Sequence, residues 1–372
     1  MAAGGTAGHL LPALGVAESL VRAGVPRESI GFLGSKRPLE QQVVAPYGFE
    51  LDQLEVSGFF RGAWLKNISS LWKAASATFE LALRIRKARP EVVIGFGGYF
   101  SFPPILAARM AGVPSVVVET NAVAGLANKI SAKFATRVFA SSESSGINKA
   151  NLIGVPLRPE IALNDGKISE AASCFRREND ISDDALLICV FGGSLGSYTI
   201  NSAVVDLAES GIAATTPPIA IYHVVGSRDF PIFAERIEAL QAKKSRVRYI
   251  SSEFDPEIYK AIAASDLVVS RAGSGTVAEL GYFAKPSILV PLPNAPGDHQ
   301  ARNARKLAEV GAARVVSDSE LTKERLAAEI EELVKEPAVL KKMAERSALA
   351  FDGDGSTKVA EAVLALAGRK GG

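Results

Sequence analysis

The chain has little of what marks a secreted, metal-bound or membrane-spanning protein. Its 372 residues include two cysteines, Cys174 and Cys189, which are too few for a disulfide scaffold and show no metal-ligand spacing. No apolar run approaches the roughly 18 residues of a membrane span, and the first residues lack the basic region of a signal peptide. Lys and Arg total 42 against 40 Asp and Glu, a net charge of +2 that gives no support to nucleic acid as a partner. We therefore expect a cytoplasmic protein, soluble or peripheral to a membrane.

The chain is rich in apolar residues, which fall in short predicted strands that alternate with predicted helices. Hydrophobic residues make up 48% of the sequence, enough for two cores, and one core rarely grows beyond about 250–300 residues. The alternation predicts two doubly wound α/β domains with parallel sheets. The expected helices include Leu11–Ala23 and Gln300–Val310, and the expected strands are Ile30–Leu33, Leu51–Val56, Val92–Ile94, Ser115–Val118, Arg137–Ala140, Leu186–Phe191, Ile219–Val225, Arg246–Ile250, Leu267–Ser270, Ser287–Val290 and Ala313–Val316.

The domain boundary is predicted at Gly154–Pro159, where two prolines and a glycine interrupt the pattern. We assign residues 1–156 to an N-terminal domain and residues 157–355 to a C-terminal domain. Residues 356–372 contain a final helix, about Thr357–Ala367, and the sequence leaves open whether it crosses back to the N-terminal domain.

A short glycine pattern, G-G-[ST]-x-G, occurs at Gly4–Gly8 and again at Gly192–Gly196, each time at the head of a strand–helix series. Glycine turns between a strand and a helix let backbone N–H groups approach a phosphate, and the helix N-terminus adds positive partial charge. Gly97–Tyr99 and Arg271–Thr276 fit the same description. One such loop is weak evidence, because any α/β fold needs tight turns, but four are stronger evidence. Since neither the dinucleotide fingerprint nor the P-loop pattern is present, a nucleotide sugar ranks above NAD or ATP as the ligand.

The N-terminus is short for this fold. Only Met1-Ala2-Ala3 precede Gly4, although a doubly wound domain needs a strand before its first glycine loop. We interpret this as a truncated N-terminus. Restoring about five apolar residues, a typical strand length, should then raise stability and activity.

Polar residues beside these loops are candidate catalytic and binding groups. His9 lies where the first loop becomes a helix, and a neutral imidazole there can accept a proton from an attacking hydroxyl. The structural alternative is a histidine that only satisfies a hydrogen bond. Glu279 can bind ribose hydroxyls or merely stabilise a helix dipole, and Asp298–Gln300 can face a ligand or cap the next helix. Asp352–Gly355 offers D-x-D but lacks the other calcium-loop positions, so we expect no metal site.

A membrane-facing surface is predicted in Trp64–Arg89. This segment has apolar residues at helical spacing, both tryptophans and several lysines and arginines. Basic amphipathic helices with tryptophan can lie in the interface of anionic membranes. We assign that role to Phe59–Lys73. The alternative is a helix packed on the sheet, which we expect for the later turns.

On these motifs the chain resembles the MurG family, bacterial transferases that move N-acetylglucosamine from UDP-N-acetylglucosamine to lipid I, forming lipid II in peptidoglycan synthesis. The resemblance is carried by G-G-T-A-G-H at Gly4–His9, S-G-F-F-R-G at Ser57–Gly62, G-F-G-G-Y at Gly95–Tyr99, E-T-N-A-V-A-G at Glu119–Gly125, G-G-S-L-G at Gly192–Gly196, R-A-G-S-G-T-V-A-E at Arg271–Glu279 and D-H-Q-A-R-N-A at Asp298–Ala304. It implies a GT-B fold and an inverting reaction without cofactor or active-site metal. It also implies an undecaprenyl-linked acceptor, a place on the cytoplasmic face of the cell membrane, and a link to cell shape and division.

The resemblance implies roles for particular residues. His9 would be the base for the acceptor hydroxyl, and Thr6, Ala7 and Gly8 would face the sugar–phosphate region. The implied donor contacts are Asn121 and Arg158 on the sugar and diphosphate, Ser194 on the diphosphate, Phe254 and Asp255 at the uracil, Ser274, Gly275, Thr276, Val277, Ala278 and Glu279 on the diphosphate and ribose, and Gln300 on the sugar.

Three departures from the family pattern affect donor contacts. The usual H-E-Q-N reads Val118–Asn121, and the usual N-P-V-R reads Val155–Arg158. Asp255 stands where an isoleucine is common near the uracil. A contact from the backbone to the uracil would survive this change, whereas a contact from the side chain would not.

Other function classes fit the same architecture. One is a transferase with another lipid or metabolite acceptor, and another is a UDP-N-acetylglucosamine epimerase, which forms no glycoside. A third is a non-catalytic nucleotide-sugar-binding subunit that recruits partners to a membrane. Turnover by the purified protein separates the enzymes from the subunit.

Overall fold

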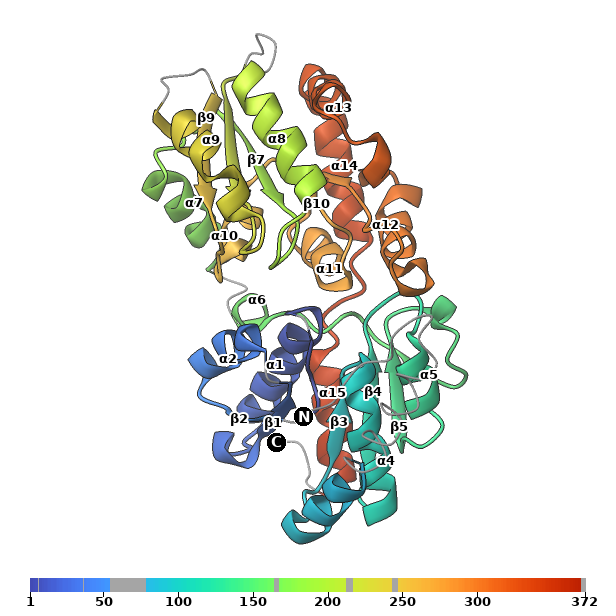
Figure 1. The fold of residues 1–372 in the computed structure, drawn as a ribbon. Coiled ribbons are helices and arrows are strands. Elements are labelled where there is room, and N and C mark those ends of the chain that lie inside the picture. The colour runs from blue at the N-terminus through green and yellow to red at the C-terminus, as the bar shows by residue number, and fades with distance from the viewer. Residues whose placement is uncertain are drawn as a thin grey trace, which may run out of the picture. The chain divides into compact units, whose positions relative to one another are not determined.

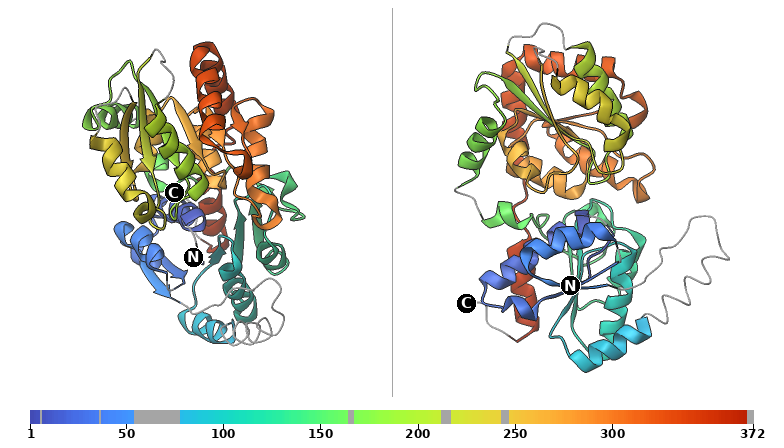
Figure 2. Two further views of the ribbon diagram at one scale, coloured as in Figure 1. Left: turned by 45° about the horizontal axis from the view of Figure 1, so that its top comes forward. Right: turned by 60° about the vertical axis from the view of Figure 1, so that its left-hand side comes forward.

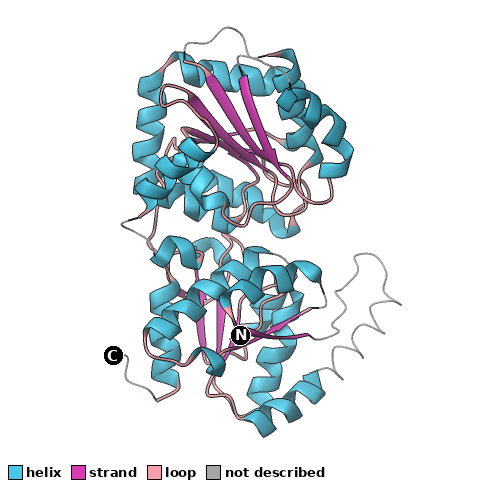
Figure 3. Cartoon of the chain, turned by 90° about the vertical axis from the view of Figure 1, so that its left-hand side faces the viewer, coloured by secondary structure: helices cyan, strands magenta, loops and turns pink. Residues whose placement is uncertain are grey.

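The computed structural model describes residues 1–5, 7–35, 37–53, 78–163, 167–211, 217–242 and 247–368. They form two compact units (Figure 1). Unit 1 comprises Met1–Ala162 and Asp352–Gly372, and unit 2 comprises Leu163–Phe351. Each unit is a Rossmann-like domain with helices on both faces of its parallel strands (Figures 2 and 3), so the predicted fold class is confirmed. Thr6, Ser57–Gly62 and Phe59–Lys73, on which predictions were made, lie outside the described residues.

Unit 1 is built on short parallel strands with the central strand β4 buried along its whole length. Alternating strands and helices put helices on both faces, so β4 reads Ser-Val-Val-Val-Glu, a largely β-branched run. The strands are β1 (Gly31–Gly34), β2 (Glu50–Gln53), β3 (Val93–Gly95), β4 (Ser115–Glu119), β5 (Arg137–Ala140) and β6 (Asn151–Leu152). The helices are α1 (Ala7–Arg22), α2 (Pro38–Val44), residues 78–88, α4 (Phe102–Ala111), α5 (Leu126–Ser131), α6 (Pro159–Leu163) and α15 (Ser356–Leu366).

Residues Met1–Ala3 lie where the first strand of a doubly wound sheet is expected. Ala2 forms parallel bridges to Leu33 of β1 and Gly95 of β3. Its N–H donates to the Ile94 carbonyl at 2.6 Å and its carbonyl accepts from the Phe96 N–H at 3.0 Å. These contacts join β1 and β2 to the β3–β4–β5–β6 ladder and fix the residue before the first glycine loop.

The C-terminal segment belongs to unit 1, where α15 lies beside α1 (Figure 1). The chain before α15 touches the Gly154–Pro159 segment backbone to backbone: a Cβ on Gly154 would stand 1.6 Å from the Gly353 carbonyl oxygen. Asp354 Oδ1 accepts hydrogen bonds from the Leu157 and Ser356 N–H groups at 3.0 and 2.9 Å. In the D-x-D pattern at 352–355, the Asp354 carboxylate therefore ties two chain segments together.

Unit 2 contains a six-stranded parallel sheet in the order β12-β11-β10-β7-β8-β9. The strands are β7 (Leu186–Phe191), β8 (Ile219–Val224), β9 (Val247–Ser252), β10 (Leu267–Ser270), β11 (Ser287–Leu289) and β12 (Ala313–Val315). The helices are α7 (Ile168–Glu178), α8 (Tyr198–Ser210), α9 (Phe230–Ala242), α10 (Ile258–Ala264), α11 (Ser274–Tyr282), α12 (His299–Glu309), α13 (Lys323–Lys335) and α14 (Pro337–Leu349). In both units, none of the described helices is long and apolar enough to cross a lipid bilayer.

Candidate functional site

In unit 1 three loops end on the carboxyl edge of the sheet, the edge at which open α/β folds bind ligands. His9 is the third residue of α1, directly after the first loop, and its imidazole is half-buried against Gly97 and Gly98. A Cβ on Gly97 would stand 3.2 Å from His9 Cδ2, and one on Gly98 would stand 3.3 Å from His9 Cε1. Both glycines have positive φ, +101° and +71°, which glycine adopts without strain. We call these two residues the glycine shelf, because they leave room for the ring.

Glu119, at the end of β4, is buried and organises the loop that carries Asn121. Its Oε1 accepts from the Asn121 N–H at 2.9 Å and from Asn121 Nδ2 at 3.1 Å. Its Oε2 accepts from Asn128 Nδ2 at 2.9 Å and from the Gly125 N–H at 3.3 Å. A buried carboxylate with several donors is well satisfied and rigidifies the groups around it. Glu119 therefore holds the Asn121 loop through both of its carboxylate oxygens.

Asn128, on α5, connects this loop to the glycine shelf. The Ser101 hydroxyl lies 3.3 Å from Asn128 Oδ1 and 3.1 Å from the Gly98 carbonyl oxygen. The Asn121 loop and the surface under His9 are thus parts of one hydrogen-bond network. Sequence reasoning missed Asn128 because it lies beyond the E-T-N-A-V-A-G motif, in the first turn of α5.

Arg158 is buried in unit 1, close to Tyr47 and Glu160. The Tyr47 hydroxyl donates to Glu160 Oε1. Burial raises the pKa of Tyr47 well above its ordinary value, the hydrogen bond and charge of Glu160 raise it further, and the Arg158 charge partly offsets them. Arg158 is 9% exposed, so the structure places its guanidinium mostly inside the unit.

In unit 2 the second glycine loop follows β7 and leads into α8. Ser197 caps α8, with its Oγ accepting from the Ile200 N–H at 3.4 Å. The Ser194 carbonyl accepts from the N–H and hydroxyl of Ser227, at 3.2 and 3.3 Å. Gly196 has a φ of +94°, and a Cβ on it would stand 2.3 Å from the Val225 carbonyl oxygen. Ser194 is therefore presented by a loop that packs on the β8–α9 connection through its backbone.

A buried polar network lies behind this loop. His223 on β8 is fully buried, with Nδ1 2.7 Å from the Tyr249 hydroxyl and Nε2 3.0 Å from Asn201 Oδ1. Asn201 Nδ2 donates to Asp229 Oδ2 at 3.1 Å and to the Val225 carbonyl at 2.9 Å. Burial lowers the pKa of His223 to about 3, so the ring is neutral at physiological pH. Because Asn201 Oδ1 is an acceptor, the proton is assigned to Nε2, and Nδ1 accepts from Tyr249.

A further loop of unit 2 connects β10 to α11. Residues Ser274 to Glu279 follow it and form the start of α11. Gly273 has extended backbone angles as the residue before α11, and Ser274, Val277 and Glu279 are buried while Gly275, Thr276 and Ala278 are partly exposed. Asn303 on α12 donates to the Ala272 carbonyl at 3.1 Å. This helix start can bind an anionic group, since its first N–H groups have no intrahelical partners.

Arg271 precedes that loop but does not extend into it. Its guanidinium donates to the Val290 and Pro291 carbonyls, both at 3.1 Å, and lies 2.6 Å from Asp318 Oδ1. Asp318 Oδ2 in turn accepts from the Thr199 hydroxyl at 3.1 Å. Arg271 therefore holds the ends of neighbouring strands and connects to the first turn of α8.

The predicted uracil contacts lie on the loop after β9, and the predicted sugar contact, Gln300, is the second residue of α12. Phe254 is 39% exposed. Asp255 Oδ2 accepts from the Tyr222 hydroxyl at 2.9 Å, and its Oδ1 accepts from the Glu257 N–H at 2.8 Å. Gln300 Oε1 accepts from the Leu292 N–H at 2.9 Å. The Asp255 side chain thus serves the loop itself, which favours a backbone contact to any ligand there.

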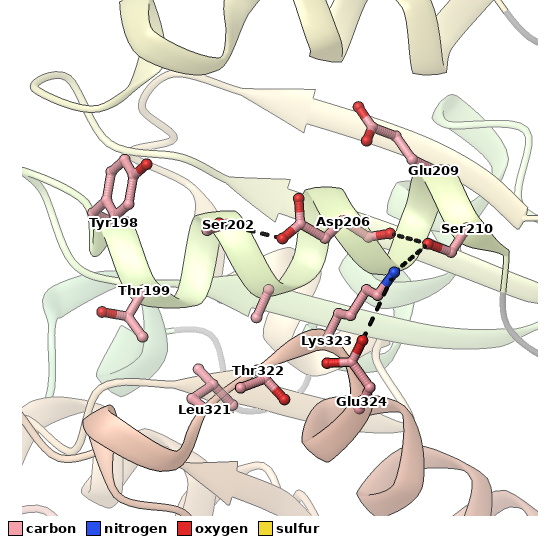
Figure 4. Close-up of a pocket in the computed structure, with 11 residues that line it drawn as sticks. Tyr198, Thr199, Ser202, Asp206, Glu209, Ser210, Leu321, Thr322, Lys323 and Glu324 are labelled. Atoms are coloured by element: carbon pink, nitrogen blue, oxygen red, sulfur yellow. Dashed lines mark hydrogen bonds and ion pairs between the residues drawn. The ribbon is translucent and has the colours of Figure 1, made fainter.

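A groove of about 480 Å³ lies elsewhere in unit 2, between α8 and the start of α13 (Figure 4). Lys323 Nζ donates to the Ser210 hydroxyl at 3.2 Å, and Ser202 Oγ lies 3.4 Å from Asp206 Oδ2. None of the predicted site residues lines this groove. The structure therefore brings the predicted residues together in two sets: Ala7, Gly8, His9 and Asn121 in unit 1, and Ser194, Phe254, Asp255, Ser274–Glu279 and Gln300 in unit 2.

Two doubly wound domains, each with glycine loops and helix starts on the carboxyl edge of its sheet, are the architecture of GT-B glycosyltransferases. The glycosyltransferase family 28 N-terminal domain matches residues 1–140, and the glycosyltransferase family 28 C-terminal domain matches residues 187–359. The chain belongs to glycosyltransferase family 28 and, within it, to the MurG family.

Comparisons with individual proteins agree with this assignment. The UDP-N-acetylglucosamine--N-acetylmuramyl-(pentapeptide) pyrophosphoryl-undecaprenol N-acetylglucosamine transferase of Thermodesulfovibrio yellowstonii is 34% identical, over 98% of each chain. The protein of the same name from Desulforamulus reducens is 37% identical, over 92% of each chain. Among solved structures, Acinetobacter baumannii MurG is 25% identical with a TM-score of 0.72, over 98% of each chain. A UDP-GlcNAc 2-epimerase from Neisseria meningitidis shares the fold, with a TM-score of 0.65 at 15% identity over 97% of this chain and 98% of that one.

Proposed function

We propose that this protein transfers N-acetylglucosamine from UDP-N-acetylglucosamine to the C4 hydroxyl of lipid-linked N-acetylmuramyl-pentapeptide, converting lipid I to lipid II with inversion at the anomeric carbon. The observation that carries this proposal is the 34–37% identity to transferases of that name over at least 92% of each chain. The retained loop residues in both units support it.

Unit 2 is proposed to hold the donor. The helix start at Ser274–Glu279 and the loop carrying Ser194 both offer backbone N–H groups at the carboxyl edge of one sheet. A diphosphate is stabilised by such donors, and more strongly as negative charge develops on the departing UDP. Phe254 and the backbone of Asp255 are proposed to contact the uracil, and Gln300 the sugar.

Unit 1 is proposed to hold the acceptor and the base. The acceptor hydroxyl attacks the anomeric carbon, the bond between that carbon and the UDP oxygen breaks, and the His9 imidazole takes the hydroxyl proton. The glycine shelf leaves the ring half-buried and in a defined place, and a positioned neutral imidazole is a suitable general base. Asn121, whose loop is held by hydrogen bonds to Glu119, is proposed to contact the donor sugar. We propose that Arg158 adds positive charge near the diphosphate.

The lipid-linked acceptor calls for contact with the cytoplasmic face of a membrane, and the helix over residues 78–88 offers a suitable surface. Its Leu81, Ala82 and Ile85 pack against Ala107 and Ala108 of α4. On its other face Phe79 and Leu83 are 59% and 53% exposed. The same stretch contains exposed Arg86, Lys87 and Arg89, and an exposed Arg84 that pairs with Glu80. Apolar side chains flanked by basic ones favour an anionic lipid surface.

The double variant Phe79→Glu/Leu83→Glu tests this surface. We expect binding to vesicles containing anionic phospholipid to fall by about 10-fold or more, because two apolar contacts are lost and two negative charges face the lipid. Leu349→Glu on α14 is the control, since Leu349 is also exposed, at 85%. Vesicle flotation measures both, and equal binding of the two variants would reject the proposed surface.

The transfer reaction is tested with radiolabelled UDP-N-acetylglucosamine and a lipid I analogue. We expect labelled lipid-linked disaccharide, and far less product with UDP-galactose as donor. Chromatography of the remaining donor should show no UDP-N-acetylmannosamine. Epimerised donor without glycoside would replace the proposal by an epimerase, and labelled product only with another lipid acceptor would replace the acceptor.

A further inference from the structure

A carboxylate that sequence reasoning did not single out holds the first glycine loop. Glu40, on α2, is fully buried, at 0% exposure. Its Oε1 accepts from the Gly5 N–H at 2.7 Å, and its Oε2 accepts from the Ser35 N–H at 2.5 Å. The Ser35 hydroxyl also donates to Oε1. The carboxylate therefore bridges the glycine loop and the end of β1.

The carbonyl group of Gly5 is also bonded to a side chain. Arg37, the residue before α2, donates from its guanidinium to the Gly5 carbonyl at 2.6 Å. Gly5 thus has its N–H on Glu40 and its C=O on Arg37, while its own φ of +97° is one that glycine adopts freely. Two side chains, one from the residue before α2 and one from its first turn, thus fix a glycine, the residue type whose backbone has the most freedom in the unfolded chain.

The surrounding sequence leaves space for this contact. A Cβ on Gly34 would stand 2.2 Å from Glu40 Oε2, so a larger residue there would displace the carboxylate. A Cβ on Gly4 would meet Glu40 Oε1 at 3.4 Å and the Phe100 ring at 3.3 Å. Gly34, at the end of β1, therefore leaves the space that the Glu40 carboxylate occupies.

We propose that Glu40 is a positioning residue for the transfer reaction, holding the Gly5 backbone and through it the start of α1 and His9. This inference rests on the proposed role of His9. Because the Gly5 N–H is already bonded to Glu40, that group is not a ligand donor, unlike the anion-binding amides expected of a glycine turn. A displaced catalytic group loses rate steeply, by about 100-fold for an error of about 1 Å.

The test is Glu40→Met, which removes all three accepted hydrogen bonds and keeps the side-chain length. The matched control is Glu18→Met, which removes a buried carboxylate of α1 itself that pairs with Arg27 instead. We expect Glu40→Met to lower kcat by about 100-fold, with the KM for UDP-N-acetylglucosamine changed by less than about threefold. Glu18→Met should lose stability, measured as Tm, without a comparable loss of kcat. Equal kcat for the two variants would overturn the proposal.

A second readout does not depend on turnover. The protein has three histidines, so the His9 ring can be assigned by NMR with His9→Ala and His299→Ala. We expect Glu40→Met to shift or broaden the His9 ring signals and leave those of His299 in place. If Glu40→Met does not fold, Ser35→Ala removes one donor to Glu40 and should shift the same signals. Unmoved His9 signals would overturn the proposal, whereas absence of product from the wild type would count against the proposed function instead.

Discussion

The two glycine loops of this protein begin alike and then diverge. Gly5 and Gly193 occupy the same place in the shared pattern, with φ of +97° and +101°, and a Cβ on either would meet nothing within 4 Å. After that residue the first loop enters its helix at once, at Ala7, whereas the second makes a further turn through Gly196 before α8 begins at Tyr198. His9 is therefore inside a helix, while Ser194 stays on a loop.

The loops also differ in what holds them. Side chains hold the first, since Glu40 and Arg37 bond both polar groups of Gly5. Backbone packing holds the second: a Cβ on Gly226 would stand 2.1 Å from the Gly196 nitrogen. A clamped loop that runs straight into a helix suits the placing of one titratable side chain, whereas a loop packed through glycines suits the display of backbone groups. If the proposed function holds, the same five-residue pattern thus supports two different tasks.

The largest expected effect is that of His9→Ala. If the first loop serves the acceptor step, kcat should fall by roughly 10²–10⁴-fold, as expected for loss of a general base. The affinity for UDP should stay within about twofold, because we propose that the loops of unit 2 bind the uracil and most of the diphosphate. Single-turnover rates and calorimetric UDP titration measure the two quantities. Near-normal turnover would remove His9 from the role of base, and a large loss of UDP affinity would break the division of tasks between the loops.

A pair of glycine variants tests the backbone packing of the second loop. Gly193→Ala introduces a side chain at positive φ in open space, which should cost about 1–3 kcal/mol of unfolding free energy. Gly196→Ala has similar φ but its Cβ would stand 2.3 Å from the Val225 oxygen, so overpacking should add about 1–3 kcal/mol. Urea unfolding measures both. Equal losses would show that close packing at Gly196 is not what holds this loop, and Gly5→Ala should resemble Gly193→Ala.

Much of the fold could be predicted from the sequence because short apolar runs that alternate with helical patterns mark the strands of parallel sheets. The predicted strands Arg137–Ala140, Leu186–Phe191 and Leu267–Ser270 have the observed bounds. The two-residue strand β6 was missed, since Asn151–Leu152 is too short and too exposed to show a pattern. The start of α1 was predicted four residues late, because the glycines before Leu11 read as a loop.

The site was predictable to the level of its loops but not of their supports. Motif spacing predicted that His9, Ser194 and Ser274–Glu279 lie in or directly after glycine turns, and the structure has them there. Glu40, Asn128 and Asp229 act from other segments of the chain, and neither their spacing nor their residue type distinguishes them from ordinary polar residues. Their roles depend on which donors the fold brings to them, and only the packed structure shows that.

The smallest expected effect is a loss of stability in acid, caused by the buried histidine behind the second glycine loop. Burial lowers the pKa of His223 to about 3 in the folded protein, against about 6.5 in the unfolded chain. Between these values only the unfolded chain binds the proton, so stability falls as the pH drops from about 6.5 toward 3. At pH 5, about 1.5 pH units below the unfolded value, the loss should be about 2 kcal/mol relative to pH 7.5. His223→Gln cannot titrate and should lose that much less between the two pH values, because its amide keeps a donor and an acceptor without gaining charge. Urea unfolding at both pH values gives the difference, and an identical pH dependence in the two proteins would mean that the network behind the second loop does not exclude the proton.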